Sequence, residues 1–247
     1  FFDIWVNNAP GTVLGRDVYL KEVRLRIQHQ WAADLTIRLI SPNGTRVILT
    51  MNNGGGSDNY GIPDSANCQG YVRFATSACT PIDQGEAPFI DKVYLPQESF
   101  LNFNDNKTNV NGIWQLLICD DSEQDTGRLE FVELIFAPLS CLPAQSVSIV
   151  AQDTTTVVLD WTPSDGCSSG VSVVEYGPPG FVPGTGVQAG VGGRLVPFNS
   201  CPPFALQGLL PDTPYDIYIR RTCNGGAFSD NSCPISIRTG CLPPKPT

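Results

Sequence analysis

The chain lacks most of the patterns that catalysis, nucleic-acid binding and membrane insertion require. It has one histidine, and no H-E-x-x-H motif accompanies it, so the helical zinc-protease constellation is missing. Lys and Arg total 15 against 24 Asp and Glu, and the formal net charge of −9 would repel a polyanion. No apolar run reaches the length of about 18 residues that a membrane-spanning helix needs. We therefore expect no catalysis, no nucleic-acid partner and no transmembrane segment.

Helix-forming stretches are also missing. No Gly- and Pro-free window of about ten residues keeps apolar side chains at helical spacing. The chain holds 24 Gly and 21 Pro, and its Val, Ile and Leu residues cluster in short runs between turn signals. This pattern predicts an all-β fold. Because 247 residues exceed the usual size of one domain, we expect two β-sandwiches in tandem.

Cysteine usage indicates an exported protein. Nine cysteines with one histidine and no repeated C-x-x-C pair favour disulfides over zinc ligation, and disulfides persist in oxidising compartments. The expected location is extracellular or at the cell surface. An odd count leaves at least one thiol free or bonded outside the chain, and we expect this orphan to be Cys241. The first residues lack the basic start and long apolar core of a signal peptide, so any targeting segment is expected to be already removed.

A short repeat sets the expected domain boundaries. Ser140-Cys141-Leu142-Pro143 recurs as Gly240-Cys241-Leu242-Pro243, at about the spacing of one immunoglobulin-like sandwich. We expect a first domain over residues 1–138 and a second over residues 139–240. Residues 241–247 would then be a linker or the start of a truncated next repeat in a longer polypeptide.

The first unit carries strand patterns that resemble a known family. Apolar and polar residues alternate over residues 23–27 and 35–39, and Ser41-Pro42-Asn43-Gly44 predicts a turn into a hairpin. The whole pattern resembles the P domain that follows subtilisin-like catalytic domains in proprotein convertases and in many bacterial secreted proteins. The resembling residues are 23–27, 29–31, 34–37, 39–45, 111–116 and 125–129. The resemblance implies a jelly-roll-like sandwich that stabilises a neighbouring protease without performing chemistry. Val132 departs from it, since the family usually carries Trp there.

The second unit shows the spacing of a Greek-key sandwich, with short strands expected throughout. The expected strands lie near residues 145–150, 156–161, 171–176, 186–191, 204–209, 215–221 and 234–239. Trp161 and residues 209–220, with Tyr215 at a tyrosine corner, resemble a fibronectin type III domain. Residues 175–181 and the leading Cys141-Leu142-Pro143 are similar to repeats in secreted multidomain proteins of Bacteroidota.

Calcium is the best ligand hypothesis, because carboxylate and carbonyl oxygens can hold long extracellular loops. The glycine-rich loop and the strand leading into it offer Asp34, Asp58 and Asp64 as metal ligands. The alternative is that these residues only form turns. A second acidic cluster over residues 120–125 is interpreted as a hairpin turn, and His29 beside Trp31 as structural.

Cysteine pairing and glycosylation add further candidate sites. Cys68 and Cys79 are expected to staple the loop-rich part of the first unit. In the second unit we expect Cys167 to pair with Cys201, and Cys223 with either Cys233 or Cys141, while Cys119 stays a buried free thiol. The strings at Asp64-Ser65-Ala66 and Asp153-Thr154-Thr155 resemble the Bacteroidota O-glycosylation pattern, with Ser65 and Thr154 as acceptors. Asn43 and Asn106 begin N-linked sequons.

The opening run Phe1-Phe2-Asp3-Ile4-Trp5-Val6 allows two interpretations. It is either the first strand of the first sandwich or a strand donated to a neighbouring copy or domain. The leading functional hypothesis is a non-catalytic structural or interaction segment of an adhesin, a surface layer or a filament, whose partners are proteins. The rival is an accessory module behind a secreted subtilisin-like protease. Carbohydrate binding would call for a row of exposed aromatic rings, whereas the four tryptophans fall mostly in core motifs.

Overall fold

The computed structural model describes residues 1–66, 69–123, 125–162 and 171–242. It divides the chain into two compact units, Phe1–Leu139 and Ser140–Thr247, so that the boundary lies next to the expected one at residue 138. Regular structure in the described residues is β-strand, apart from short 3₁₀ turns. None of the helices in this part of the chain is long and apolar enough to span a membrane.

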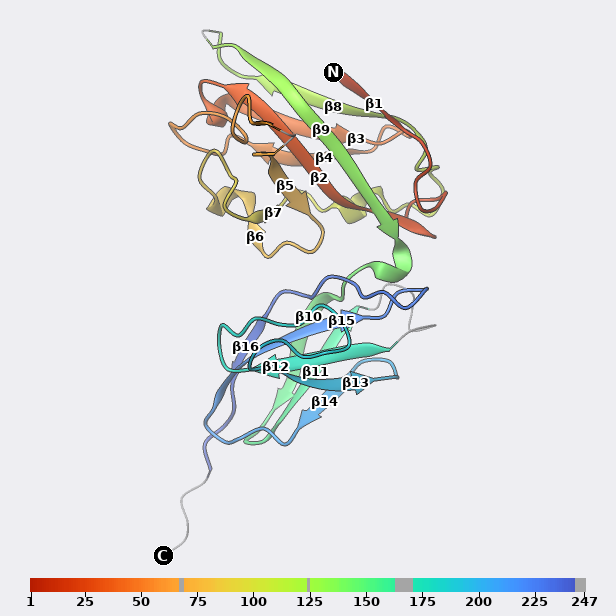
Figure 1. Cartoon of the computed structure of the whole chain (residues 1–247), viewed down its shortest axis with the longest axis vertical. Coiled ribbons are helices and arrows are strands. Elements are labelled where there is room, and N and C mark those ends of the chain that lie inside the picture. The colour runs from red at the N-terminus through yellow and green to blue at the C-terminus, as the bar shows by residue number, and fades with distance from the viewer. Residues whose placement is uncertain (67–68, 124, 163–170, 243–247) are drawn as a thin grey trace, which may run out of the picture. The chain divides into compact units, whose positions relative to one another are not determined.

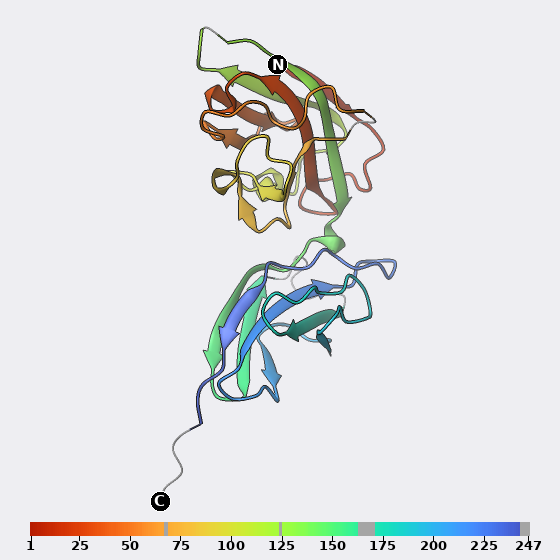
Figure 2. The ribbon, with the colours of Figure 1, turned by 60° about the vertical axis from the view of Figure 1, so that its left-hand side comes forward.

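The first unit, as far as it is described, is a sandwich of a four-stranded sheet, β1-β8-β3-β4, and a five-stranded sheet, β6-β7-β5-β2-β9 (Figures 1 and 2). Its strands are β1 (Phe2–Val6), β2 (Val18–His29), β3 (Leu35–Ile40), β4 (Arg46–Met51), β5 (Val72–Ala75), β6 (Thr80–Pro81), β7 (Val93–Leu95), β8 (Gly112–Asp120) and β9 (Gly127–Pro138). β1 pairs with β8 of the same chain from Phe2 to Val6, so the opening run forms a strand of its own sandwich.

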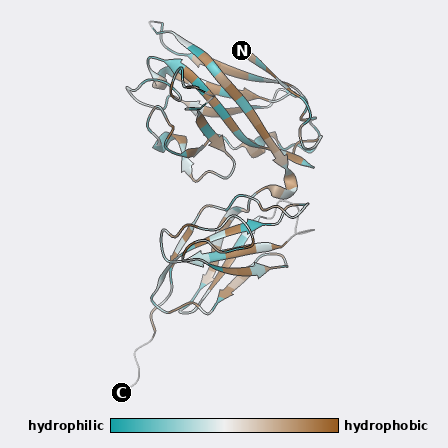
Figure 3. Cartoon of the chain, viewed as in Figure 1, coloured by the Kyte–Doolittle hydropathy of each residue, from teal (hydrophilic) through white to brown (hydrophobic). Residues whose placement is uncertain are grey.

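The core of this unit lies between the two sheets. Val23, Leu25 and Ile27 alternate along β2 and are buried, as the period of two requires for a strand with one face on a core. Figure 3 shows the same alternation of hydrophilic and hydrophobic positions along the strands. Trp114 of β8 is fully buried and donates its indole N–H to the Val110 carbonyl oxygen at 2.9 Å. The predicted hairpin at residues 41–44 joins β3 to β4.

The second unit, in its described residues, is a sandwich of a three-stranded sheet, β10-β11-β14, and a four-stranded sheet, β13-β12-β15-β16. Its strands are β10 (Gln145–Gln152), β11 (Thr156–Thr162), β12 (Ser172–Gly177), β13 (Arg194–Phe198), β14 (Phe204–Gln207), β15 (Pro214–Arg221) and β16 (Ile235–Arg238). Trp161 belongs to the core between the sheets. The Tyr215 hydroxyl accepts a hydrogen bond from the Leu210 amide at 3.0 Å, which is the predicted tyrosine corner.

One predicted strand of the second unit is wrong. Residues 186–191 form part of a long loop between β12 and β13, and the fourth strand lies at Arg194–Phe198. Two fully buried side chains hold this loop, Glu175 of β12 and Arg220 of β15, which form an ion pair. Glu175 accepts hydrogen bonds from the amides of Gly184 and Gly190 at 3.0 and 2.6 Å, and Arg220 donates to the Gly186 carbonyl at 2.7 Å. The loop backbone is therefore bonded to side chains instead of to a strand partner.

Candidate functional site

A group of polar side chains in the first unit lies where β2 and β8 end and β9 begins. In the β2–β9 ladder His29 pairs with Gly127, and in the β3–β8 ladder Leu35 pairs with Asp120. The amide of Asp121 donates to the carbonyl oxygen of Asp34 at 2.9 Å. Strand pairing thus gathers residues from distant parts of the sequence. We call this group the acidic end, which comprises His29, Asp34, Asp120, Asp121 and Asp125.

His29 is locked inside the acidic end. His29 is 2% exposed, and its Nε2 lies 3.1 Å from Oδ2 of Asp120. Its Nδ1 lies 2.8 Å from the carbonyl oxygen of Trp31 and 3.2 Å from the Trp31 amide nitrogen. Both ring nitrogens are therefore engaged within the fold. This arrangement fits the structural role predicted for His29.

Asp125 stands in an unfavourable environment for a negative charge. Partial desolvation raises the pKa of its carboxyl group, and the hydrogen bond and charge of Asp34 raise that pKa further. Asp120 acts in the same direction, while His29 lowers the pKa. The acidic end thus holds carboxylates that destabilise one another when all are ionised.

Two cavities flank the pair of His29 and Gly127. The first has a volume of about 180 Å³ and a largely apolar lining, with Asp120 and Arg128 as its charged members. Its apolar lining residues are Phe2, Ile27, Leu35, Ile118 and Leu129. The second cavity, of about 340 Å³, is polar, and its side chains include Gln28, Gln30, Asp58 and Asn59. The first cavity therefore suits an aliphatic side chain, and the second suits polar groups.

The three aspartates expected to bind calcium are not brought together. Asp34 lies in the acidic end, Asp58 lines the polar cavity, and the carboxylate of Asp64 accepts a hydrogen bond from Arg128 at 2.7 Å. In the part of the chain that the structure describes, no group of three or more His, Cys, Asp or Glu side chains is arranged to hold a metal ion. A calcium site that uses Asp34, Asp58 and Asp64 with carbonyl oxygens stays a prediction.

Arg26 holds the loop that contains Asp64. Its guanidinium donates to the carbonyl oxygens of Ser65 and Gln69 at 3.1 and 2.6 Å and to the Glu130 carboxylate at 2.8 Å. Burial raises the pKa of Glu130, but hydrogen bonds from Arg128, the Asp64 amide and Arg26 lower it more, so its pKa lies below the ordinary value. Sequence reasoning placed Arg26 on a solvent-facing position of a strand and missed this role, because nothing local shows that a loop covers that face.

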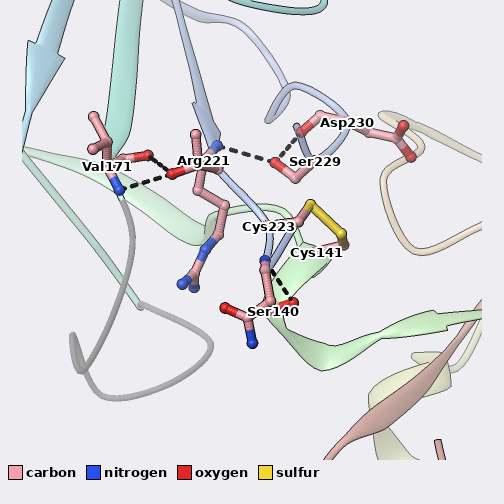
Figure 4. The surroundings of a disulfide bond; sticks show 9 residues. Ser140, Cys141, Val171, Arg221, Cys223, Ser229 and Asp230 are labelled. Carbon is pink, nitrogen blue, oxygen red and sulfur yellow. Dashed lines mark hydrogen bonds between the residues drawn. A yellow bond between two sulfur atoms is a disulfide. The ribbon is translucent and has the colours of Figure 1, made fainter. Parts of the chain in front are cut away.

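The disulfides differ in part from the predictions. Cys141, in the 3₁₀ turn Leu139–Cys141, is bonded to Cys223, which was one of the two partners considered for Cys223. The amide of Asn224 donates to Oγ of Ser140 at 3.2 Å beside the bond (Figure 4). The start of the second unit is thereby fastened to the segment that follows β15.

The predicted pairing of Cys167 with Cys201 is wrong, since Cys201 is an exposed free thiol. The sequence places several cysteines near one pole of the sandwich, but a disulfide needs Cα atoms within about 4.4–6.8 Å, and only the fold decides which pairs come that close. Cys141 and Cys223 do so at 4.8 Å. Cys79 and Cys233 are disulfide-bonded, while Cys68 and Cys167 lie outside the described residues. Cys119 and Cys241 are free, but Cys119 is half-buried and not fully buried as expected.

The candidate glycosylation sites lie in turns. Ser65 and Thr154 are half-buried, and the carboxylate of Asp153 accepts from the amides of Thr155 and Thr156 at 2.7 Å. The side-chain amide of Asn43 donates to Asp105 at 3.1 Å, so a glycan there would replace this bond. Modification at these positions stays a prediction.

Two tryptophans are more exposed than the sequence suggested. Trp5 is 70% exposed and Trp31 is 46% exposed, whereas Trp114 and Trp161 are buried. Trp5 lies on β1, opposite Ile113 of β8, and Trp31 follows the end of β2. Half of the tryptophans are thus surface groups, and the expectation that they mostly lie in the core is wrong.

A family model of the proprotein convertase P-domain matches residues 21–68. This stretch holds most of β2, all of β3 and β4, and Ser65 of the loop that Arg26 binds. The chain is therefore an all-β protein of two sandwiches, the first of which carries a P-domain match. None of the curated proteins compared with the chain matches it.

The chain is similar to several solved structures of fibronectin type III domains. The FN5 domain of Drosophila Lar is 20% identical, with 40% of this chain and 95% of that chain covered and a TM-score of 0.30. The fn3 domain of the human collagen alpha-1(XX) chain is 25% identical, with coverages of 42% and 89% and a TM-score of 0.31. The chicken CNTN1 FN1–FN3 domains are 13% identical, with coverages of 87% and 56% and a TM-score of 0.33. Such TM-scores carry no argument about function.

Proposed function

We propose that the chain is a non-catalytic structural and interaction segment of a larger secreted or cell-surface protein, such as an adhesin, a surface-layer component or a filament. The observation that carries this proposal is the use of the buried polar side chains. His29 joins strand ends, Arg26 binds a loop, and Glu175 with Arg220 holds another loop. Enzymes present such groups to a cleft as reacting groups, whereas here they stabilise the fold.

The disulfides support an extracellular location. Cys141 is bonded to Cys223, and Cys79 and Cys233 are also disulfide-bonded. Such bonds persist in secreted and surface proteins, where no glutathione pool reduces them. The formal net charge of −9 disfavours nucleic acid as a partner and leaves proteins as the expected class.

Two measurements test the proposal. Antibodies raised against residues 1–247 should label intact source cells or their secreted material, and brief protease treatment of intact cells should remove the label. Purified chain should give no turnover above buffer with panels of peptides and glycosides. Labelling that requires cell lysis would contradict the location, and turnover that follows the purified chain would contradict the non-catalytic role.

The P-domain match favours a second candidate, an accessory module of a secreted subtilisin-like protease. In that role the sandwiches would stabilise a neighbouring catalytic domain. The test is the reading frame that encodes the chain, together with a deletion variant of its product. An Asp, His and Ser triad in the same polypeptide, and a protease that loses thermal stability when residues 1–247 are deleted, would favour this candidate over the first.

A further inference from the structure

Most sheet edges of the first unit are protected against strand addition. On the outer side of β4, the amides of Gln97 and Glu98 donate to the carbonyl oxygens of Leu49 and Ile48 at 3.1 and 3.0 Å. The strand β6 has two residues, one of which is Pro81. The strand β9 has register shifts against β2 and carries three charged residues, Arg128, Glu130 and Glu133. Capping segments, short strands, proline, bulges and charges are the usual protections of edges.

The edge at β1 has none of these protections. Its register with β8 runs without a shift from Phe2 to Val6, and the strand contains no proline. Its one charged side chain, Asp3, accepts a hydrogen bond from Gln115 of β8 at 2.9 Å and so turns toward the sheet surface. Within the described residues, no backbone hydrogen bond joins β1 to anything but β8. An edge strand of this kind presents a row of backbone donors and acceptors to an incoming strand.

Apolar groups lie on both faces of this edge. On one face Phe2, which is 43% exposed, lines the apolar cavity of about 180 Å³ together with Ile27, Ile118 and Leu129. On the other face Trp5 lies opposite Ile113, which is 37% exposed. Successive side chains of a strand point to opposite faces. A strand added to β1 would therefore place one side chain over the cavity and its neighbours beside Trp5.

The charge around the cavity is complementary to a basic segment. Asp120 lines the cavity, and the rest of the acidic end adjoins it through the bonded Asp34 and Asp121. Arg128 also lines the cavity, but its guanidinium is engaged by Asp64 and Glu130, each at 2.7 Å. A second copy of the chain would bring its own net charge of −9 to this negative surface. A basic partner is favoured on these grounds.

We propose that the β1 edge binds an extended, basic segment of another protein by strand addition, with one aliphatic side chain of that segment in the apolar cavity. The backbone ladder supplies affinity, and the cavity and the acidic end select an aliphatic residue flanked by Lys or Arg. This inference rests on the proposed interaction role and names the surface and the chemistry of the partner.

The probes are synthetic peptides of nine residues, alternating Thr and Val, with a central Leu flanked by two Lys. Fluorescence anisotropy of the labelled peptide should show saturable binding to residues 1–247, and hydrogen exchange should show protection of the β1 amides. A peptide with Glu in place of the two Lys, and one with Asp in place of Leu, should each bind at least about tenfold more weakly, which corresponds to about 1.4 kcal/mol. Raising NaCl from about 50 to 500 mM should weaken binding of the Lys peptide and should not strengthen binding of the Glu peptide.

The variant Trp5→Lys places a charge on the exposed edge and should also reduce binding at least about tenfold. Ile90→Lys is the control, because Ile90 is 45% exposed on the same unit and lies in the segment 84–92, which lines a different cavity. It should bind the peptide as the unmodified chain does, and circular dichroism should show both variants folded.

The proposal would be overturned if Trp5→Lys bound the Lys peptide as tightly as the unmodified chain does, or if the Glu peptide bound as tightly as the Lys peptide. Self-association on a sizing column that Trp5→Lys abolishes would overturn it in favour of a second copy. None of these binding and self-association measurements depends on turnover. The strand-addition proposal can therefore fail while the non-catalytic role stands.

Discussion

Arg26 and His29 lie three residues apart on β2, and each holds a part of the first unit that has little apolar surface of its own. Arg26 binds the carbonyl oxygens of a polar loop, and His29 links the end of β2 to Asp120 at the end of β8. A guanidinium can make several hydrogen bonds in one plane, which is why a single side chain can replace a bound cation in ordering loop carbonyls.

The variant Arg26→Ala should therefore destabilise the first unit by about 3 kcal/mol, because it leaves a buried carboxylate and loop carbonyls without a partner. Urea unfolding measures this change, and limited proteolysis should show faster cleavage within residues 61–66. Arg16→Ala is the control, since Arg16 is a surface residue whose ion pair with Asp17 is exposed, and it should cost less than about 0.5 kcal/mol. Equal stability of the two variants would refute the role assigned to Arg26.

Asp125 gives a prediction about pH. Its pKa is raised in the folded chain, so the folded state binds its proton more tightly than the unfolded state does. The proton on Asp125 therefore stabilises the folded chain at low pH, and this stabilisation is lost as the pH rises through the raised pKa of Asp125. Asp125→Asn should therefore raise the melting temperature near pH 7, and the gain should vanish at about pH 3, where both states are protonated. Melting curves at the two pH values measure this.

The same curves test whether calcium acts at the acidic end. In EDTA the gain from Asp125→Asn should persist, because it arises from repulsion between carboxylates. A rise in the melting temperature of the unmodified chain on adding Ca²⁺, lost in Asp125→Asn, would contradict this account and would place a cation among these side chains.

Among the elements, the loop between β12 and β13 shows where sequence reasoning succeeds and where it stops. Alternating apolar residues predict β2 and β3 of the first unit, because that period directly reports one buried face, whereas β5, β6 and β7 were not predicted. Residues 186–191 contain Val187 and Val191 at strand-like spacing and were misread, since the groups that hold the loop come from Glu175 and Arg220 elsewhere in the chain. A family model matches the P-domain resemblance over residues 21–68, while the roles of Arg26 and Trp5 depend on contacts and exposure that no local pattern encodes.

The buried pair of Glu175 and Arg220 gives a prediction at the scale of this loop. Arg220→Met should destabilise the second unit by about 3–5 kcal/mol, because it leaves an uncompensated buried carboxylate. The double variant Glu175→Gln with Arg220→Met should be more stable than Arg220→Met alone, since it removes that charge. Urea unfolding followed by the fluorescence of Trp161 measures both. A double variant that is less stable than either single variant would show that the charge is not what makes the single change costly.

For the whole chain, the disulfide framework is the main covalent constraint. The bond between Cys141 and Cys223 spans 82 residues, and closing a loop of that length destabilises the unfolded state by about 4.5 kcal/mol in the chain-entropy model. Replacing both cysteines by Ser should lower the stability of the second unit by an amount of that order, measured by thermal unfolding without reductant. Cys201→Ser is the control, because Cys201 is an exposed free thiol, and its stability should be nearly unchanged. A double Ser variant as stable as this control would show that the bond adds nothing.

The same bond changes how the chain would respond to mechanical tension. A force applied between the two ends travels through the backbone to Cys141, crosses the sulfur bridge and continues from Cys223. The 82-residue span between them is shielded from extension, and at about 3.3–3.6 Å per residue it withholds about 270–300 Å of contour length. In a tether or filament under oxidising conditions, the disulfide would thus limit how far the second unit can be extended. Force spectroscopy should show this hidden length appear only after reduction.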